Sequence, residues 1–329
     1  AAPVAPPATG GCGELMIGYI AKRVSYAVIV VWAAYTATFV LLYVLPADPV
    51  SIMLAGSEGS TSATAEERAT LEAQFGFDKP VVVQYVVLLG RALTGDFGIS
   101  VQSQAPVADE IAQALPQTVQ LALLGIVFGL ILGTGIAVAA NLTRSRALGN
   151  LLFSVPPLVA SVPPFLIALL ILQVFSFELG LFPSRGNDGI GSLILPALTL
   201  GIAISATIAQ LLAKGIHDSL SQPFVDVLRA KGLSRWGIQI GHVLKNAAIP
   251  TLTVLALLVG GIFSGAVVIE TVFSRVGVGR LLQSAVETQD IPVVQALVIL
   301  SAFAYAIVNL AVDLTYPLLD PRIRRVAAG

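Results

Sequence analysis

Long stretches without any charged residue are the feature that most restricts what this chain can fold into. Several runs of about 20 residues lack Asp, Glu, Lys and Arg, and about 20 helical residues are needed to cross a hydrocarbon layer about 30 Å thick. A soluble helix would combine its apolar residues with a solvated face, whereas these runs are apolar on every side. Charged residues make up only 11% of the chain, against about 25% in a soluble domain. The sequence therefore predicts an all-α integral membrane protein.

Six apolar segments are expected to span the membrane as helices. The third contains two proline pairs, Pro156-Pro157 and Pro163-Pro164, which should kink or break it. Glycine recurs at every fourth residue at Gly125, Gly129 and Gly133, a spacing that lets two membrane helices approach closely. The expected segments cover residues 24–45, 118–140, 151–175, 193–213, 249–269 and 293–310, the last extending to Tyr316.

The remaining residues divide the chain into five regions. Residues 1–15 are rich in Ala, Pro and Gly, so we expect a disordered extension there, with Met16 as a candidate natural start. The segment 46–117 is too polar to cross a membrane and too long for a simple loop, which favours a small subdomain. The expected regions are the extension 1–15, a first membrane helix 16–45, an extracytoplasmic subdomain 46–117, a five-helix core 118–316 and a cytoplasmic tail 317–329.

Basic residues predict the orientation of the chain in the membrane. With a cytoplasmic amino terminus, 12 of the 18 Lys and Arg residues lie on the cytoplasmic side and 6 on the other. Most of those 6 fall in long segments, which cross the membrane largely regardless of charge. We therefore expect a multi-pass protein of a bacterial inner membrane with both termini in the cytoplasm.

The residue types that carry catalysis or bind metals are scarce. Cys12 is the only cysteine, and the two histidines, His217 and His242, lie between the fourth and fifth predicted spans. The chain contains no GxxxxGK[ST], HExxH or GxSxG motif, which argues against a P-loop, a zincin site and a serine hydrolase. A net charge of −1 gives no indication of nucleic-acid binding. We expect no catalytic residue, no metal site and no cofactor in this chain.

Two acidic residues lie near the ends of predicted membrane helices. Glu270 closes the fifth segment and Asp313 lies in the sixth. Ionisable groups at membrane depth are functional candidates, and either carboxylate could line a pore. Both lie within a turn or two of a predicted helix boundary, which favours groups that are solvated at the interface or cap a helix.

The predicted cytoplasmic loop at about 214–246 is long and amphipathic. Gly232 should interrupt its helix and let the chain turn. A short amphipathic helix with basic neighbours can lie on the membrane or dock into the groove of a partner protein, and the pattern alone does not separate these two readings. The apolar stripe consists of Val225, Leu228, Leu233 and Trp236, and Arg229, Lys231 and Arg235 lie beside it.

The same loop carries a family resemblance. Its sequences RAKGLSR and HVLKN resemble the coupling-loop signature of permease subunits of the dipeptide, oligopeptide and nickel ABC importer family. The resemblance extends from about Met16 to Arg325. It departs from the family pattern at 223–228, and also at Gln210 and Val276, where family members usually carry Arg and Pro. Further similar motifs are LPADPV (45–50), FGFDKP (75–80), GDFGIS (95–100), LPQTVQLA (115–122), SVPPF (161–165), LILPALTLG (193–201), GAVVIETVF (265–273) and NLAVDLTYPLLDPRIRR (309–325).

The resemblance implies the type I ABC importer permease fold, with one peripheral helix and a five-helix core. The implied partners are a homologous second permease, two ABC ATPase subunits that bind ATP and Mg, an extracytoplasmic substrate-binding protein and membrane lipid. In the coupling loop Gly232 becomes a turn former and Ala230 a small contact residue. The residues expected to couple to the ATPase are Phe224, Leu228, Arg229, Ala230, Lys231, Gly232 and Arg235.

The expected function is thus to form half of the translocation path for peptides in an ATP-driven importer. A permease of the same family for nickel, haem, glutathione or small oligosaccharides is the alternative. A membrane enzyme would need a nucleophile or metal constellation, and none is present in the sequence. A stand-alone carrier would more often show an internal repeat.

Overall fold

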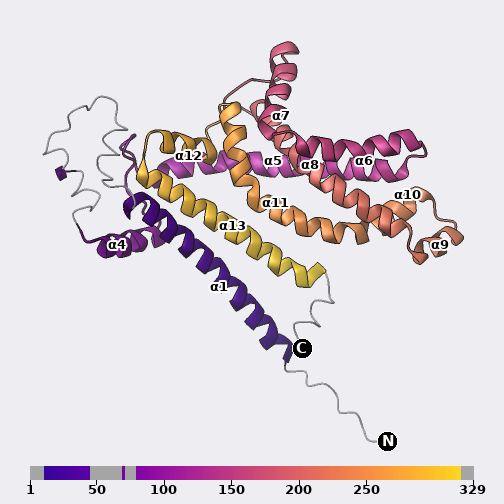
Figure 1. Cartoon of the computed structure of the whole chain (residues 1–329), viewed down its shortest axis with the longest axis horizontal. Coiled ribbons are helices and arrows are strands. Elements are labelled where there is room, and N and C mark those ends of the chain that lie inside the picture. The colour runs from indigo at the N-terminus through magenta and orange to yellow at the C-terminus, as the bar shows by residue number, and fades with distance from the viewer. Residues whose placement is uncertain (1–10, 45–68, 71–78, 320–329) are drawn as a thin grey trace, which may run out of the picture.

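The computed structural model describes residues 11–44, 69–70 and 79–319, and within these ranges the chain is helical (Figure 1). The described part contains one isolated antiparallel bridge, between Ile99 and Pro106. The all-α prediction is confirmed. The principal helices are α1 (Gly11–Phe39), α4 (Val81–Leu93), α5 (Val107–Leu142), α6 (Arg146–Ser161), α7 (Pro164–Ile171), α8 (Gly191–Leu220), α9 (Pro223–Ala230), α10 (Arg235–Ile238), α11 (Leu244–Val272), α12 (Val278–Glu287) and α13 (Ile291–Leu319). Short π-helical segments η1 (Val40–Val44), η2 (Leu172–Glu178) and η3 (Gln239–Val243) continue α1, α7 and α10.

The helix α5 forms the centre of the bundle together with α8 (Figure 1). It is 36 residues long and begins at Val107, so residues 107–117 are helical and continuous with the predicted second span. The predicted start of this span, residue 118, thus lies inside the helix, and the point at which the chain enters the membrane stays a prediction. Pro116 lies inside the helix, where a proline is tolerated in a packed membrane helix because neighbouring groups take up the freed backbone acceptor.

The glycines that recur at every fourth residue of α5 lie against α8. A Cβ atom on Gly125 would lie 2.6 Å from Leu200, one on Gly129 2.7 Å from Ile204, and one on Gly133 2.8 Å from Ile208. All three separations are below ordinary van der Waals contact, so only glycine permits this approach of the two helices. The predicted packing face is confirmed.

The predicted third span consists of two helices. The helix α6 ends at Ser161, and Pro164 is the first residue of α7, directly after Pro163. Proline is favoured at the first helical position because a backbone N–H there would have no partner within the helix. The pair is bent by 105°, and α7 projects from the bundle (Figure 1). Of the two proline pairs, Pro163-Pro164 makes the break, while Pro156-Pro157 lies within α6.

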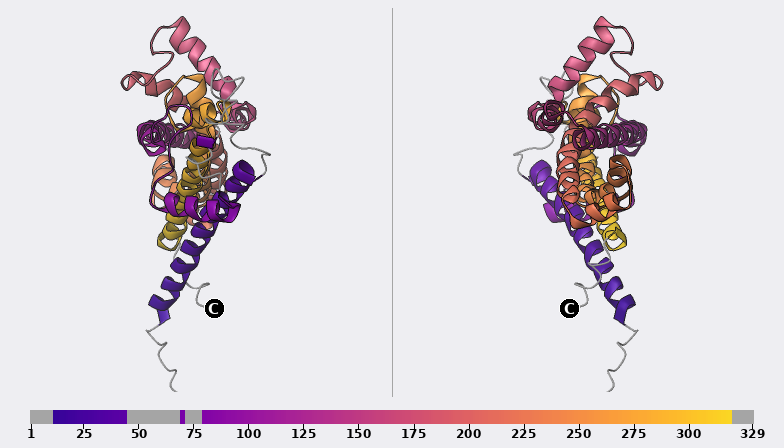
Figure 2. Two further views of the ribbon diagram at one scale, coloured as in Figure 1. Left: turned by 90° about the vertical axis from the view of Figure 1, so that its left-hand side faces the viewer. Right: turned by 90° about the vertical axis from the view of Figure 1, so that its right-hand side faces the viewer.

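The helix α1 packs along α13 at one side of the bundle (Figures 1 and 2). It already begins at Gly11, so residues 11–15 of the expected disordered extension are helical and that expectation was wrong for them. Residues 1–10, most of 46–78 and the end of the predicted tail lie outside the described residues.

Four of the described helices are long and apolar enough to cross a membrane, and the bent pair provides a fifth candidate. The helix α11 takes the place of the predicted fifth span. The count of six membrane helices therefore stays a prediction. The four qualifying ranges are Ile20–Val44, Val107–Leu142, Gly191–Leu220 and Ile291–Ala311.

The short helices gather at opposite ends of the long ones. In Figure 1, α9 and α10 lie at one end of the molecule, and α4 and α12 lie at the other. The helix α11 connects these ends, because it follows α10 and η3 directly and is followed by α12. A rigid helix thus joins the predicted coupling loop to the far end of the bundle.

Candidate functional site

The predicted coupling loop folds as two short helices around a tight turn. Pro223 occupies the first turn of α9, a position that suits its fixed φ angle. The helix ends at Ala230, and Gly232 has φ +81°, a left-handed conformation that favours glycine. Ser234 then caps α10, because its side-chain oxygen accepts the backbone N–H of Gly237 at 3.1 Å. The turn expected at Gly232 is present.

The inner face of this loop packs on the protein's own core. Val225 is fully buried, while Phe224, Leu228 and Leu233 are half-buried against the same cluster. Three of the four residues in the predicted apolar stripe therefore face inward. Because α9 uses this face to attach to its own chain, Phe224 and Leu228 are half-buried there, and their expected coupling to the ATPase stays a prediction. The cluster that receives it includes Leu212, Ala213, Ile216, Ile238, Val243 and Ala247.

The outer surface of the loop combines two large apolar side chains with cations. Val227 is 56% exposed and Trp236 is 60% exposed, and the small residue Ala230 is exposed beside them in sequence. Arg229 pairs with Asp226 at 3.2 Å, but both side chains are mostly exposed, so this pair holds α9 only weakly. Lys231 and Arg235 are also exposed. We define the outer face as Val227, Arg229, Ala230, Lys231, Arg235 and Trp236.

One amide fixes the loop to α5, and a second amide fixes α5 to α8. The Nε2 atom of Gln239, in η3, donates to the backbone oxygen of Val138 at 3.0 Å, and Gln239 is 1% exposed. The Nδ2 atom of Asn141 donates to the backbone oxygen of Ala213 at 3.1 Å, which ties α5 to α8. The loop is thus hydrogen-bonded to α5, α5 is hydrogen-bonded to α8, and η3 continues directly into α11.

Glu270, one of the two candidate acids, is buried at the far end of α11. Its side chain is 1% exposed, which excludes the solvated alternative and leaves the other one that the sequence predicted, a group that caps a helix. Thr118 donates its hydroxyl to the carboxylate at 2.6 Å, and the backbone N–H groups of Gly279 and Arg280 donate at 2.8 and 3.1 Å. The carboxylate thus caps the next helix, α12, and satisfies two N–H groups that lack a partner within that helix.

Arg275 follows Glu270 closely, and its backbone N–H donates to the backbone oxygen of Glu270 at 2.8 Å. It is 2% exposed. Its Nη1 atom donates to the backbone oxygens of Gly186 and Ser192 at 3.2 and 3.1 Å, and its Nη2 atom donates to Gln117 at 3.1 Å. Burial lowers the pKa of the Arg275 guanidinium and the charge of Glu270 raises it, and an arginine stays protonated at neutral pH.

Asp290 is a third buried charge, which the sequence reasoning missed. It is 2% exposed and accepts the hydroxyl of Ser100 at 2.6 Å and the backbone N–H of Gln102 at 3.1 Å. It also accepts the N–H of Val293 at 3.4 Å, which places it at the start of α13. The available signal was an Asp directly before an apolar helix, the pattern of an N-terminal cap.

The other candidate acid, Asp313, lies in α13, but its side chain is outside the described part of the structure. Among the described residues, no group of three or more His, Cys, Asp or Glu side chains could hold a metal ion. The structure therefore contains two separate features, at opposite ends of the long helices (Figure 1): the outer face of α9 and α10, and the buried charges that fix α12 and α13.

The chain belongs to the permease subunits of ABC importers. The family described as binding-protein-dependent transport system inner membrane component matches residues 119–325, and the amino-terminal family of the same membrane components matches residues 16–122. It is a multi-pass inner-membrane protein, and a binding-protein-dependent importer requires ATPase and binding-protein partners.

The curated relatives include the glutathione transport system permease protein GsiC. The proteins of that name from Escherichia coli strain K12 and from Shigella dysenteriae are each 35% identical over 309 residues, which cover 94% of this chain and 99% of the relative. Among solved structures, a chain of the MetNI methionine ABC transporter covers 66% of this chain and 96% of its own length, with a TM-score of 0.53 and 15% identity. The fold is that of a type I ABC importer permease.

Proposed function

We propose that this permease imports small peptides, and that the outer face of α9 and α10 is the surface on which its ATPase docks. The 35% identity to glutathione permeases over nearly the whole chain supports a small peptide substrate, because glutathione is a tripeptide. The alternatives of nickel, haem or an oligosaccharide have no comparable support.

The observation that carries the docking proposal is the exposure of Trp236 on a loop whose inner face is packed against its own core. An exposed large aromatic side chain is typical of the anchoring residues of protein interfaces. The same loop is hydrogen-bonded to α5 and continues into α11. Force from ATPase closure would therefore reach the membrane helices directly.

The full assembly that we propose contains a homologous second permease, two ATPase subunits that bind ATP and Mg, and an extracytoplasmic binding protein. Both termini and the α9–α10 loop are then cytoplasmic, and α4 and α12 are extracytoplasmic. The excess of basic residues on the loop side supports this orientation. This chain itself hydrolyses no ATP.

The docking test compares the two tryptophans of the chain. Trp236→Ala should weaken ATPase binding about ten-fold, equivalent to about 1.4 kcal/mol, as measured by titrating the permease dimer with the ATPase. Trp32→Ala is the matched control, because Trp32 is 53% exposed on α1, far along the chain from the loop. Equal binding by both variants would assign docking to another surface.

The substrate test measures uptake into proteoliposomes that contain the complex, with its binding protein and ATP supplied. We expect uptake of glutathione and of short peptides that depends on ATP hydrolysis. Uptake of nickel or an oligosaccharide with no peptide uptake would reject the peptide proposal and leave the docking proposal intact.

A further inference from the structure

The helix α4 buries Gln84, half-buries Tyr85 and has an apolar outer face. Its inner face contacts α1: the hydroxyl of Tyr35 donates to the backbone oxygen of Tyr85 at 2.9 Å, and the Tyr85 hydroxyl lies 2.8 Å from that of Thr36. On the outer face Val82 is 74% exposed and Leu93 is 81% exposed. A soluble protein rarely leaves so much apolar surface in water.

This outer face lies near further exposed apolar side chains, at the end of α1 and in η1. The end of α1 and η1 exposes Val40, Leu41 and Val44, and α1 with η1 is one of the helices able to span the membrane. Figure 1 shows α4 lying across that end of α1. A short amphipathic helix in this position has the geometry of one that lies in the membrane interface.

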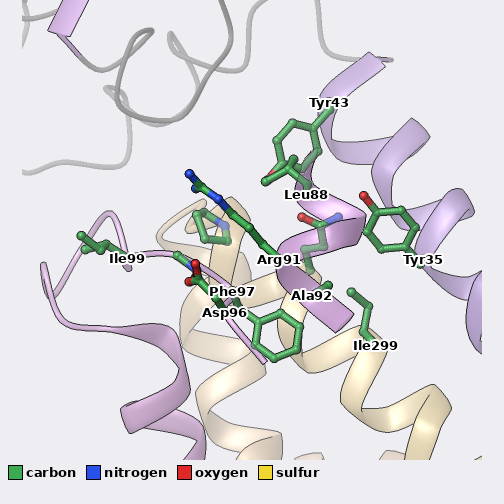
Figure 3. Close-up of a pocket in the computed structure, with 12 residues that line it drawn as sticks. Tyr35, Tyr43, Leu88, Arg91, Ala92, Asp96, Phe97, Ile99 and Ile299 are labelled. Carbon is green, nitrogen blue, oxygen red and sulfur yellow. The ribbon is translucent and has the colours of Figure 1, made fainter. Parts of the chain in front are cut away.

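A pocket of about 110 Å³ opens beside α4, between η1, α4 and α13. One water molecule needs only about 10 to 15 Å³ of such space, so the pocket can hold a polar group of several atoms. Figure 3 shows Tyr35 and Tyr43 on the α1 side, with Arg91 and Asp96 on the other side. Gln295 of α13 also lines it.

One buried polar atom in this pocket lacks a partner within the described part of the chain. Gln295 is 6% exposed, and its Nε2 atom has no hydrogen-bond partner, although a buried amide normally has one. At the exposed mouth, Arg91 and Asp96 form no ion pair with any described residue. Asp96 accepts the backbone N–H of Gly98 at 2.9 Å through one oxygen, which leaves its other oxygen able to accept.

We propose that this pocket binds the headgroup of a zwitterionic phospholipid that carries a primary ammonium group. The guanidinium of Arg91 and the amide of Gln295 are donors suited to phosphate oxygens, and the carboxylate of Asp96 is suited to the ammonium. The lipid source is favoured over a soluble zwitterion because the mouth adjoins the apolar faces of α4 and η1, where acyl chains can lie. The bound lipid fastens α4 to α1 and α13.

The test is native mass spectrometry of the purified transporter complex, delipidated in detergent and titrated with phosphatidylethanolamine. We expect one tightly held lipid per copy of this chain. Arg91→Gln and Asp96→Asn should each raise its Kd about ten-fold. The matched controls, Arg185→Gln and Asp188→Asn, change exposed residues outside the pocket and should bind normally.

Two further probes identify the source of the ligand. Phosphatidylglycerol, which has no ammonium group, should bind more weakly, and soluble O-phosphoethanolamine should not displace the lipid. Equal binding of both lipids, or displacement by the soluble headgroup, would overturn the proposal.

Gln295→Leu provides a variant that is expected to fold well, because it removes the unpartnered amide. Its melting temperature without lipid should match or exceed that of the natural chain, whereas the rise on adding phosphatidylethanolamine should be lost. An undiminished rise in this variant would show that the lipid binds elsewhere.

Discussion

The carboxylate of Glu270, at the end of α11, accepts the backbone N–H of Gly279 in the first turn of α12 at 2.8 Å. A side chain of one helix therefore caps the next one, across the turn that holds Arg275. Since α11 also begins directly after the coupling loop, Glu270 joins that loop, through one continuous helix, to the far end of the bundle. Capping by a buried carboxylate is stronger than capping by a neutral group because the bonds are charge-assisted.

Replacement of Glu270 should destabilise this junction. In Glu270→Gln an amide NH₂ would replace one of the two accepting oxygens and leave a donor in α12 or the Thr118 hydroxyl unpaired, at a cost of about 1 to 3 kcal/mol. Glu270→Ala should cost more, because it also removes the countercharge near buried Arg275. The measurement is the thermal unfolding midpoint of the purified protein.

Glu287→Gln is the control for this series, since Glu287 is exposed at the other end of α12. We expect its midpoint to be unchanged. If Glu270→Gln unfolds at the same temperature as Glu287→Gln, the carboxylate does not hold α12.

The glycine face of α5 predicts a sharp difference between two alanine substitutions in one helix. A Cβ at Gly129 would lie 2.7 Å from Ile204, whereas a Cβ at Gly135 meets nothing within 4 Å. Gly129→Ala should therefore destabilise the protein by about 1 to 3 kcal/mol through overpacking. Gly135→Ala should be neutral or slightly stabilising, because alanine favours a helix. Equal effects in thermal unfolding would contradict the close approach of α5 and α8.

The hydrogen bond between Ser100 and Asp290 should fix the segment after α4 to α13. Ser100→Ala removes a buried donor to a buried carboxylate, which should cost about 1 to 3 kcal/mol. A loss of about 1.4 kcal/mol corresponds to a factor of ten in an equilibrium constant. Amide hydrogen exchange in residues 96–106 should therefore become about ten-fold faster. Thr94→Ala changes an exposed hydroxyl in the same segment and should leave exchange unchanged. The same exchange rates in both variants would show that Asp290 does not hold this segment.

Replacement of Gly232 should reduce the coupling of uptake to ATP hydrolysis without loss of the membrane helices. Its φ of +81° is strained for a β-branched residue, at a cost of about 1 to 3 kcal/mol. Gly232→Val should therefore disturb the turn between α9 and α10 and reduce peptide uptake per ATP hydrolysed. Asparagine tolerates this conformation better, so Gly232→Asn should retain more coupling. Normal uptake by Gly232→Val would show that the turn is not needed for coupling.

The orientation is tested with two single cysteines in a Cys12→Ser background. Ser103 lies between α4 and α5 and Ser221 lies between α8 and α9, and both are exposed. A membrane-impermeant thiol reagent added to intact cells should label Ser103→Cys, and should label Ser221→Cys only after the cells are opened. Labelling of both cysteines in intact cells would reject the predicted topology.

The sequence by itself determined the membrane class, the location of the apolar helices and the family. Each of these depends on local information: a run without charge, a repeat of glycine, or a string of motif residues. The turn at Gly232 was predictable for the same reason, because one residue type favours a left-handed backbone. The break at Pro163-Pro164 was also local, although its 105° angle was not predictable.

Tertiary structure alone decided which polar groups are buried and which apolar groups are exposed. Glu270 is buried because Thr118, more than 150 positions earlier, lies beside it, and no local pattern reports such a neighbour. Likewise Val225 and Trp236 belong to one apolar stripe in the sequence, yet the first packs on its own core and the second is exposed. Periodicity identifies the apolar face of a helix, but the helices packed against it determine whether that face stays free for a partner.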